Sequence, residues 1–236
     1  MSEPGLSSRK TEVSEDVFWA VYDRATSTLQ ERGLAHLLTG GIASAAHGYP
    51  RWSHTGEDID LLVRPSDARS TLDALDEVGF ETEQTHPDWM FKALLDGVIV
   101  DLIFRPAGGI ELDEEMLSHQ RVDEFKGRSL RMVGPEDLMI MLAASYEEGQ
   151  PIRLKNLLGV LSHSNIDWNY LISRVGGNAD RLTSFLVYAD SKDIFIPRQV
   201  LTTVISSSVR RSAVEEPSDT NRASQDHDRT DTHRVP

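Results

Sequence analysis

The chain of 236 residues contains no cysteine. Disulfide bonds, thiolate nucleophiles and cysteine-ligated zinc are therefore excluded. Long apolar runs are also missing, both at the N-terminus, where a secretory signal would carry one, and in the rest of the chain. Neither a signal peptide nor a membrane-spanning helix is expected from such a pattern. These absences predict a cytoplasmic protein that has no membrane partner.

Basic residues are scarce compared with acidic ones. The chain has 24 Lys and Arg against 38 Asp and Glu, which gives a formal net charge of -14. Such a balance argues against a broad electrostatic contact with nucleic-acid backbones, because that contact needs clustered cations. A local group of four cations is better explained as the solvated edge of the fold, and its members are Arg121, Lys126, Arg128 and Arg131.

The distribution of apolar residues divides the chain into four parts. Residues 1–12 are expected to form a flexible leader, and residues 13–133 an α/β core in which strands alternate with amphipathic helices. The region 134–203 is predicted to be helical. Residues 209–236 carry few large apolar side chains, so burial cannot offset the entropy lost on ordering, and we expect them to be disordered.

The stretch HTGEDIDLLV places Asp58 and Asp60 at the start of an apolar strand. Side chains alternate between the faces of a strand, so both carboxylates point one way, while Ile59 and Leu61 point toward the core. Adjacent carboxylates repel each other, and an uncompensated charge is costly to remove from water. A divalent cation is the simplest compensation, and a solvated strand end is the plainer alternative.

A second stretch, MFKALLDGVIVDLIFRP, predicts a hairpin. Asp96-Gly97 is a favoured pair for a two-residue turn, and this turn sets Lys92 opposite Asp101. Opposed side chains lie on one face, about 5 Å apart at Cβ. Lys92 could therefore neutralise Asp101, or it could lie beside metal ions and contact a phosphate; the sequence leaves both roles open.

The pair Gly40-Gly41 stands where a strand turns into a helix, ahead of the two aspartates. Glycines there allow the backbone to approach a ligand closely, and a helix N-terminus offers N–H groups to phosphate. Three carboxylates on adjacent strands suit Mg²⁺ or Mn²⁺, and such ions could bind a triphosphate. Asp101 would take the proton from an acceptor hydroxyl. We therefore favour an open metal site for Asp101.

The stretches LLTGGIASAAHGYPRWSHTGEDIDLLV and VDLIF together resemble the DNA polymerase beta-like nucleotidyltransferase superfamily, most closely its bacterial members related to abortive-infection toxins. The resemblance covers about Leu34 to Val175. It implies a mixed β-sheet core flanked by helices and followed by a helical region, two metal ions, and transfer of a nucleoside monophosphate from NTP to an RNA or protein hydroxyl. It assigns phosphate binding to Gly40 and Gly41, metal binding to Asp58 and Asp60, and the role of third ligand or base to Asp101.

Further nucleotide-binding residues follow from the same resemblance. RLKNLLGVL is similar to a helix that reads R-x-K-D-x-x-D-V in relatives, which matches Arg153 and Lys155 but has Asn156 and Gly159 in place of acids. Arg51, in the loop before the two aspartates, could reach a triphosphate or be an ordinary loop cation. A toxin would imply an antitoxin partner. The alternatives are an antibiotic-modifying nucleotidyltransferase with a small-molecule acceptor, and a non-catalytic nucleotide-binding or partner-binding module.

Overall fold

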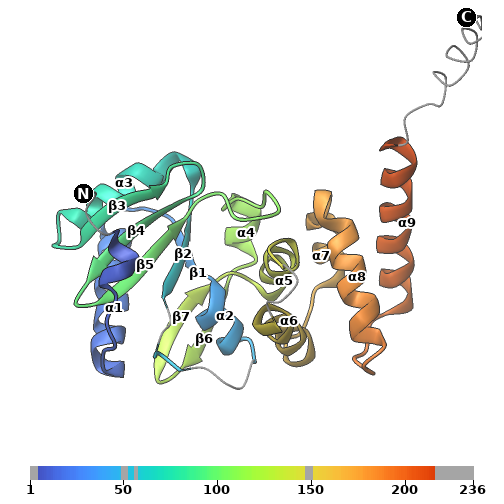
Figure 1. The fold of residues 1–236 in the computed structure, drawn as a ribbon. Helices are drawn as coiled ribbons and strands as arrows, with labels where there is room; N and C mark the ends of the chain where they lie inside the picture. The colour runs from blue at the N-terminus through green and yellow to red at the C-terminus, as the bar shows by residue number, and fades with distance from the viewer. Residues whose placement is uncertain (1–4, 49–52, 56–57, 147–150, 216–236) are drawn as a thin grey trace, which may run out of the picture.

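The computed structural model describes residues 5–48, 53–55, 58–146 and 151–215. Its centre is a seven-stranded sheet with the strand order β3-β4-β5-β2-β1-β7-β6 (Figure 1). The strands are β1 (His36–Leu38), β2 (Ile59–Val63), β3 (Glu81–His86), β4 (Met90–Leu95), β5 (Val98–Ile103), β6 (Arg121–Phe125) and β7 (Arg128–Met132). Two neighbouring pairs, β2 with β5 and β1 with β7, are parallel and the other pairs are antiparallel. The predicted mixed α/β fold is confirmed.

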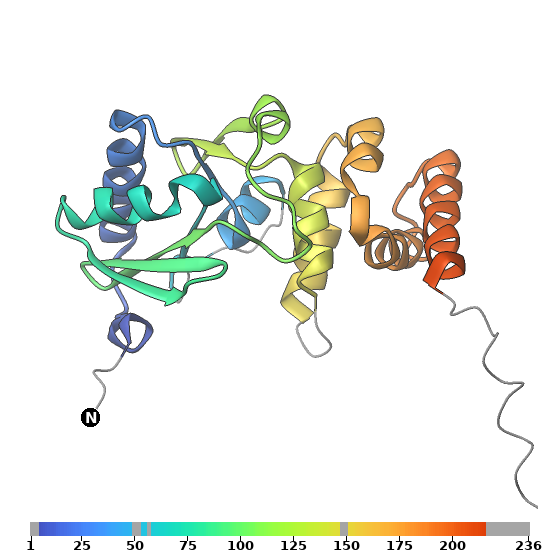
Figure 2. The ribbon, with the colours of Figure 1, turned by 90° about the horizontal axis from the view of Figure 1, so that it is seen from above.

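One face of the strands β3, β4 and β5 is covered by α1 (Glu15–Glu31) and α3 (Ala68–Asp76). Figure 2 shows both helices on the same side of these strands. Helix α1 begins where Ser14 accepts a hydrogen bond from the Val17 backbone N–H, as expected for a serine cap. The side chains of β2 that alternate with its aspartates are fully buried, namely Ile59, Leu61 and Val63.

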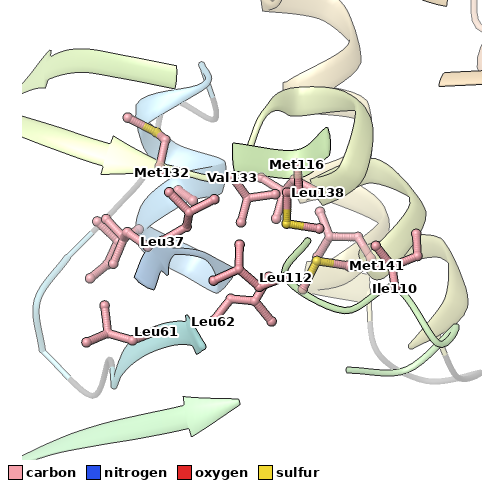
Figure 3. Packing of buried hydrophobic residues seen from close by; sticks show 14 of the residues in the cluster. Leu37, Leu61, Leu62, Ile110, Leu112, Met116, Met132, Val133, Leu138 and Met141 are labelled. Atoms are coloured by element: carbon pink, nitrogen blue, oxygen red, sulfur yellow. The ribbon is translucent and has the colours of Figure 1, made fainter. Parts of the chain in front are cut away.

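The sheet joins the helical half of the chain through α2 (Gly40–Ala46), α4 (Glu114–Ser118) and α5 (Pro135–Ala144). Figure 3 shows Leu62 of the sheet near Leu112, which precedes α4, with Leu138 of α5 beside them. Residues 135–143 of α5 are all buried, so this helix is enclosed on every side.

The remaining helices are α6 (Pro151–His163), α7 (Trp168–Arg174), α8 (Ala179–Asp190) and α9 (Arg198–Glu215), with short 3-10 turns η2 (Pro65–Asp67) and η3 (Gly176–Asn178). Buried Asp137 ties α5 to α7, since it accepts from Tyr170 Oη at 2.5 Å and Arg174 Nε at 2.9 Å. Within the described residues, none of the helices has the length and apolar character to cross a membrane. Residues 209–215 were expected to be disordered but continue α9; residues 216–236 lie outside the described residues.

The N-terminal leader differs from its prediction as a loose segment. Residues 6–9 form the 3-10 turn η1 (Leu6–Arg9), and Leu6 is buried against Leu94 and Ile99. The Leu6 backbone N–H donates to Glu83 at 2.7 Å. Figure 2 shows this turn on the side of the sheet opposite α1 and α3. A single apolar side chain makes no periodic signal, which is why the sequence did not reveal the packing.

The predicted basic edge is the β6–β7 hairpin, which turns at Lys126-Gly127. Arg128 forms an ion pair with Asp23 of α1, and Lys126 lies 3.8 Å from Glu15 of the same helix. These cations are thus partly neutralised by α1, and β6 is otherwise an exposed edge strand. This arrangement supports the solvated-edge interpretation over a nucleic-acid patch.

Candidate active site

The structure brings Asp58, Asp60 and Asp101 together. Asp60 is the direct neighbour of Asp101 in the parallel register of β2 and β5. Asp58 stands two residues before Asp60, so the alternation of the strand puts it on the same face. The charge of Asp58 raises the pKa of Asp101, although less than burial does. Three acidic side chains therefore share one face at the start of β2.

A glycine turn lies directly against this face. Gly40 has φ +66°, and a Cβ added to it would lie 1.9 Å from Asp60 Oδ2. The Thr39 backbone N–H also donates to the Asp60 carbonyl at 2.9 Å. The Thr39 hydroxyl is buried and has no hydrogen-bond partner in the described part of the chain. Only glycine fits between the turn and the carboxylate, while Gly41 continues into α2.

The hairpin register is confirmed, because Lys92 pairs with Asp101 and Leu95 with Val98 around Asp96-Gly97. The Lys92 Nζ donates to Asp101 Oδ1 at 2.6 Å, and each residue keeps only 8% of its surface exposed. Burial raises the pKa of Asp101, and the hydrogen bond from Lys92 offsets part of that rise. The open site that we favoured from the sequence is therefore not what the structure has. Lys92 neutralises a buried carboxylate.

A second lysine at the site comes from the leader. Lys10 Nζ donates to Asp58 Oδ1 at 2.5 Å, across 48 positions of sequence. The sequence does not reveal this contact, because nothing in a polar leader indicates which strand it will meet. Two of the three aspartates thus carry an ammonium partner, Asp58 from the leader and Asp101 from β4.

Lys10 and Lys92 form ion pairs with two of the three predicted metal ligands, Asp58 and Asp101. Among the residues that the structure describes, no group of three or more acidic or histidine side chains is arranged to hold a metal ion. Lys10 and Lys92 provide the positive charge that a cation would otherwise supply. The donor set nevertheless fits Mg²⁺ or Mn²⁺ in kind, since it consists of carboxylates on one face. The Asp60 carboxylate occupies the space that a Cβ at Gly40 would fill.

Of the other predicted nucleotide-binding cations, two lie on α6 and one lies outside the described residues. Arg153 and Lys155 are on α6, and the Arg153 guanidinium donates to the hydroxyl of Ser145, which ends α5. That contact joins α6 to the end of α5. Lys155 is exposed. Arg51 lies outside the described residues.

The contact between Gly40 and Asp60 predicts an unusual cost for Gly40→Ala. A non-glycine residue in the left-handed region costs about 1–2 kcal/mol from backbone strain alone. The added methyl group would also displace the Asp60 carboxylate, so we expect a greater loss of stability together with loss of activity. Thermal melts and activity assays measure both effects.

Gly33→Ala is the matched control for this substitution. Gly33 has φ +68°, and a Cβ there would meet nothing within 4 Å. Gly33→Ala should lose stability through backbone strain alone, because its methyl group meets no neighbouring atom. It should leave activity unchanged. Equal destabilisation by the two substitutions, with activity retained in both, would contradict the close approach of the turn to Asp60.

Comparison with known proteins gives matches of two kinds. By structure, the chain is similar to the antibiotic-resistance factor ANT(2″)-Ia, with a TM-score of 0.49 and 14% identity over 85% of this chain and 99% of that chain. It is also similar to the lincosamide antibiotic adenylyltransferase LnuA, with a TM-score of 0.45 and 14% identity over 64% of this chain and 99% of that chain. By sequence, it is 27% identical to elongation factor Ts of Chlamydia felis (strain Fe/C-56) over 139 residues, which are 57% of this chain and 45% of that protein. The chain thus spans less than half the length of this curated relative.

The family comparison covers most of the chain. Residues 7–188 match a family described as uncharacterised nucleotidyltransferase. The matched region runs from η1 to α8 and includes the three aspartates, the Gly40-Gly41 turn and both lysines of the site. The chain belongs to the uncharacterised nucleotidyltransferase family.

Proposed function

We propose that this protein transfers a nucleoside monophosphate from an NTP to a hydroxyl group of RNA or protein, with two Mg²⁺ or Mn²⁺ ions bound. The observation that carries the proposal is the meeting of Asp58, Asp60 and Asp101 on one face, against the turn at Gly40. Membership of a nucleotidyltransferase family supports the reaction class. Carboxylates grouped in this way are the ligands that nucleotidyl transfer needs.

Each residue has a role in this proposal. Asp58 and Asp60 hold the cations, with Asp101 as the third ligand or the base, and the backbone of Gly40 and Gly41 contacts the outer phosphates. When bound, the cations neutralise charge on the triphosphate and favour ionisation of the acceptor hydroxyl. The acceptor oxygen bonds to the α-phosphorus as the bond to pyrophosphate breaks, and Asp101 takes the hydroxyl proton.

Burial supports Asp101 as the proton acceptor, because it raises the pKa of this carboxyl group. A carboxylate with a raised pKa holds a proton more readily than a solvated one. Lys92, paired with Asp101 in the free protein, would turn its ammonium group to a phosphate once Asp101 is protonated or bound to a cation. Arg51, Arg153 and Lys155 remain proposed contacts of the triphosphate.

The direct test is an assay of label transfer. We expect the purified protein, incubated with Mg²⁺ and one α-labelled NTP at a time, to label total RNA or the proteins of a cell lysate. An RNA or protein acceptor is what the toxin of a toxin–antitoxin pair would modify, and an antitoxin protein would then be its partner. Label on an added aminoglycoside or lincosamide would identify the antibiotic-modifying alternative instead.

A second measurement distinguishes the non-catalytic alternative. When the protein is titrated with each NTP in the presence of Mg²⁺, it should bind at least one of these nucleotides. NTP binding without label transfer to any acceptor class would indicate a nucleotide-binding module. Absence of both would contradict the proposed function and favour a partner-binding module.

A further inference from the structure

The leader lies across the face that carries the aspartates. Leu6 packs on Leu94 and Ile99, and Ile99 stands two residues before Asp101 on the same face of β5. The leader is held at further points, since the Thr11 backbone N–H donates to the Gly97 carbonyl at 3.1 Å. In Figure 2 the turn η1 lies on the side of β4 and β5 that α1 and α3 leave uncovered. Residues 5–11 therefore form a strap beside the candidate active site.

The two lysines at the site differ in exposure. The side chains of Lys92 and Asp101 are exposed by only 10% and 11%, whereas those of Lys10 and Asp58 are exposed by 25% and 32%. Water therefore screens the Lys10–Asp58 pair more than the Lys92–Asp101 pair, and the attraction within an ion pair weakens as its exposure to water increases. Lys10 is also carried by the strap rather than by a central strand of the sheet. It is therefore the lysine that a competing cation would displace first.

We propose that Lys10 is a built-in competitor of the divalent cation at Asp58, so that the strap sets how tightly the site is loaded; this inference rests on the proposed function. The ammonium group occupies Asp58 Oδ1 at 2.5 Å. A cation bound to the same oxygen must displace it, because two positive charges cannot share one carboxylate oxygen without strong repulsion. The other contacts of the strap, at Leu6 and Thr11, do not involve the aspartates and hold it in place.

The experiment is a calorimetric titration of the full chain with Mn²⁺ alone. Lys10→Met should bind Mn²⁺ up to about 5-fold more tightly than the wild type, as the loss of a weak, partly exposed competing pair predicts. Lys10→Gln, which keeps a polar side chain, should show the same tightening. Lys10→Arg retains the charge and should keep the wild-type affinity. Melting temperatures recorded for each variant show that the fold is intact.

Arg9→Met is the matched control. Arg9 belongs to the same strap and loses the same unit charge, but its guanidinium pairs with Glu81 on β3, with Nη2 2.7 Å from Oε1. Its Mn²⁺ affinity should equal that of the wild type. Equal tightening in the Arg9 and Lys10 variants would overturn the inference, since a general change of charge would then explain both.

The remaining outcomes separate this inference from the proposed function. If the wild type and the Lys10 variants bind Mn²⁺ with equal affinity, or if the variants bind it more weakly, Lys10 is no competitor and the inference falls while the metal site stands. If neither the wild type nor any variant binds Mn²⁺, both the proposed metal site and this inference are contradicted.

Discussion

Asp60→Asn is expected to abolish nucleotidyl transfer while leaving the fold intact. Asp60 stands at the centre of the site, beside Asp101 in the strand register and against the turn at Gly40. The substitution keeps the shape of the side chain but removes the charge that a divalent cation requires. We expect the rate to fall by at least about 10²-fold, the loss typical when one stabilising group of a transition state is removed. Because asparagine keeps the size and shape of the side chain, the melting temperature should change little.

The measurement combines label transfer, Mn²⁺ titration and a thermal melt with and without metal. Asp58→Ala should likewise remove metal binding, although it also breaks the pair with Lys10. Asp123→Asn is the control, because Asp123 is an exposed aspartate on β6. It should keep both activity and metal binding. The metal site would be ruled out if Asp60→Asn kept the wild-type turnover. It would also be ruled out if the melting temperature of the wild type did not change when the divalent cation was added.

Lys92→Met is expected to produce the largest loss of stability. The substitution leaves the carboxylate of Asp101 without its partner in a pair that is nearly nine-tenths buried. Breaking one side of a buried ion pair costs about 3–5 kcal/mol, because the remaining charge is neither solvated nor neutralised. Chemical denaturation followed by circular dichroism would measure the change in the free energy of unfolding.

A double substitution tests the cause of this loss. Lys92→Met with Asp101→Leu removes both charges, so it should recover most of the stability but have no activity. Arg69→Met is the comparison, since the pair of Arg69 with Asp73 on α3 is exposed by more than half at each side chain. That substitution should cost less than about 1 kcal/mol. A similarly small cost for Lys92→Met would mean that Asp101 is solvated. That result would support the open metal site that the sequence favours for Asp101.

Local features of the sequence were sufficient for much of the sheet. The pair Asp96-Gly97 determined the hairpin register, because a two-residue turn leaves one way to pair the strands and Lys92 then faces Asp101. Alternation along β2 determined that Asp58 and Asp60 share a face opposite to the core side chains. Ser14 and Asp167 likewise cap the helices that follow them, as serine and aspartate commonly do. Each of these depends on residues within a few positions of one another.

Two parts of the fold carry only weak local signals in the sequence. The strands β6 and β7 alternate charged and apolar residues irregularly, and their turn at Lys126 relies on a positive φ of 53° in a non-glycine residue. Helix α9 includes a Ser- and Thr-rich stretch with modest intrinsic helix preference, and its end, residues 209–215, lies beyond the predicted helical region. In both cases packing against neighbouring elements, not local preference, decided the structure.

The sequence by itself therefore determined which residue types make up the candidate site: the three aspartates, the Gly40-Gly41 turn and the lysine opposite Asp101. Only the tertiary structure decided how these charges are balanced. It buried the Lys92–Asp101 pair, brought Lys10 from the leader to Asp58, and set the turn at Gly40 against Asp60. The physical reason is distance along the chain. Burial and ion pairing between segments tens of residues apart depend on how whole elements pack, and no local pattern records that packing.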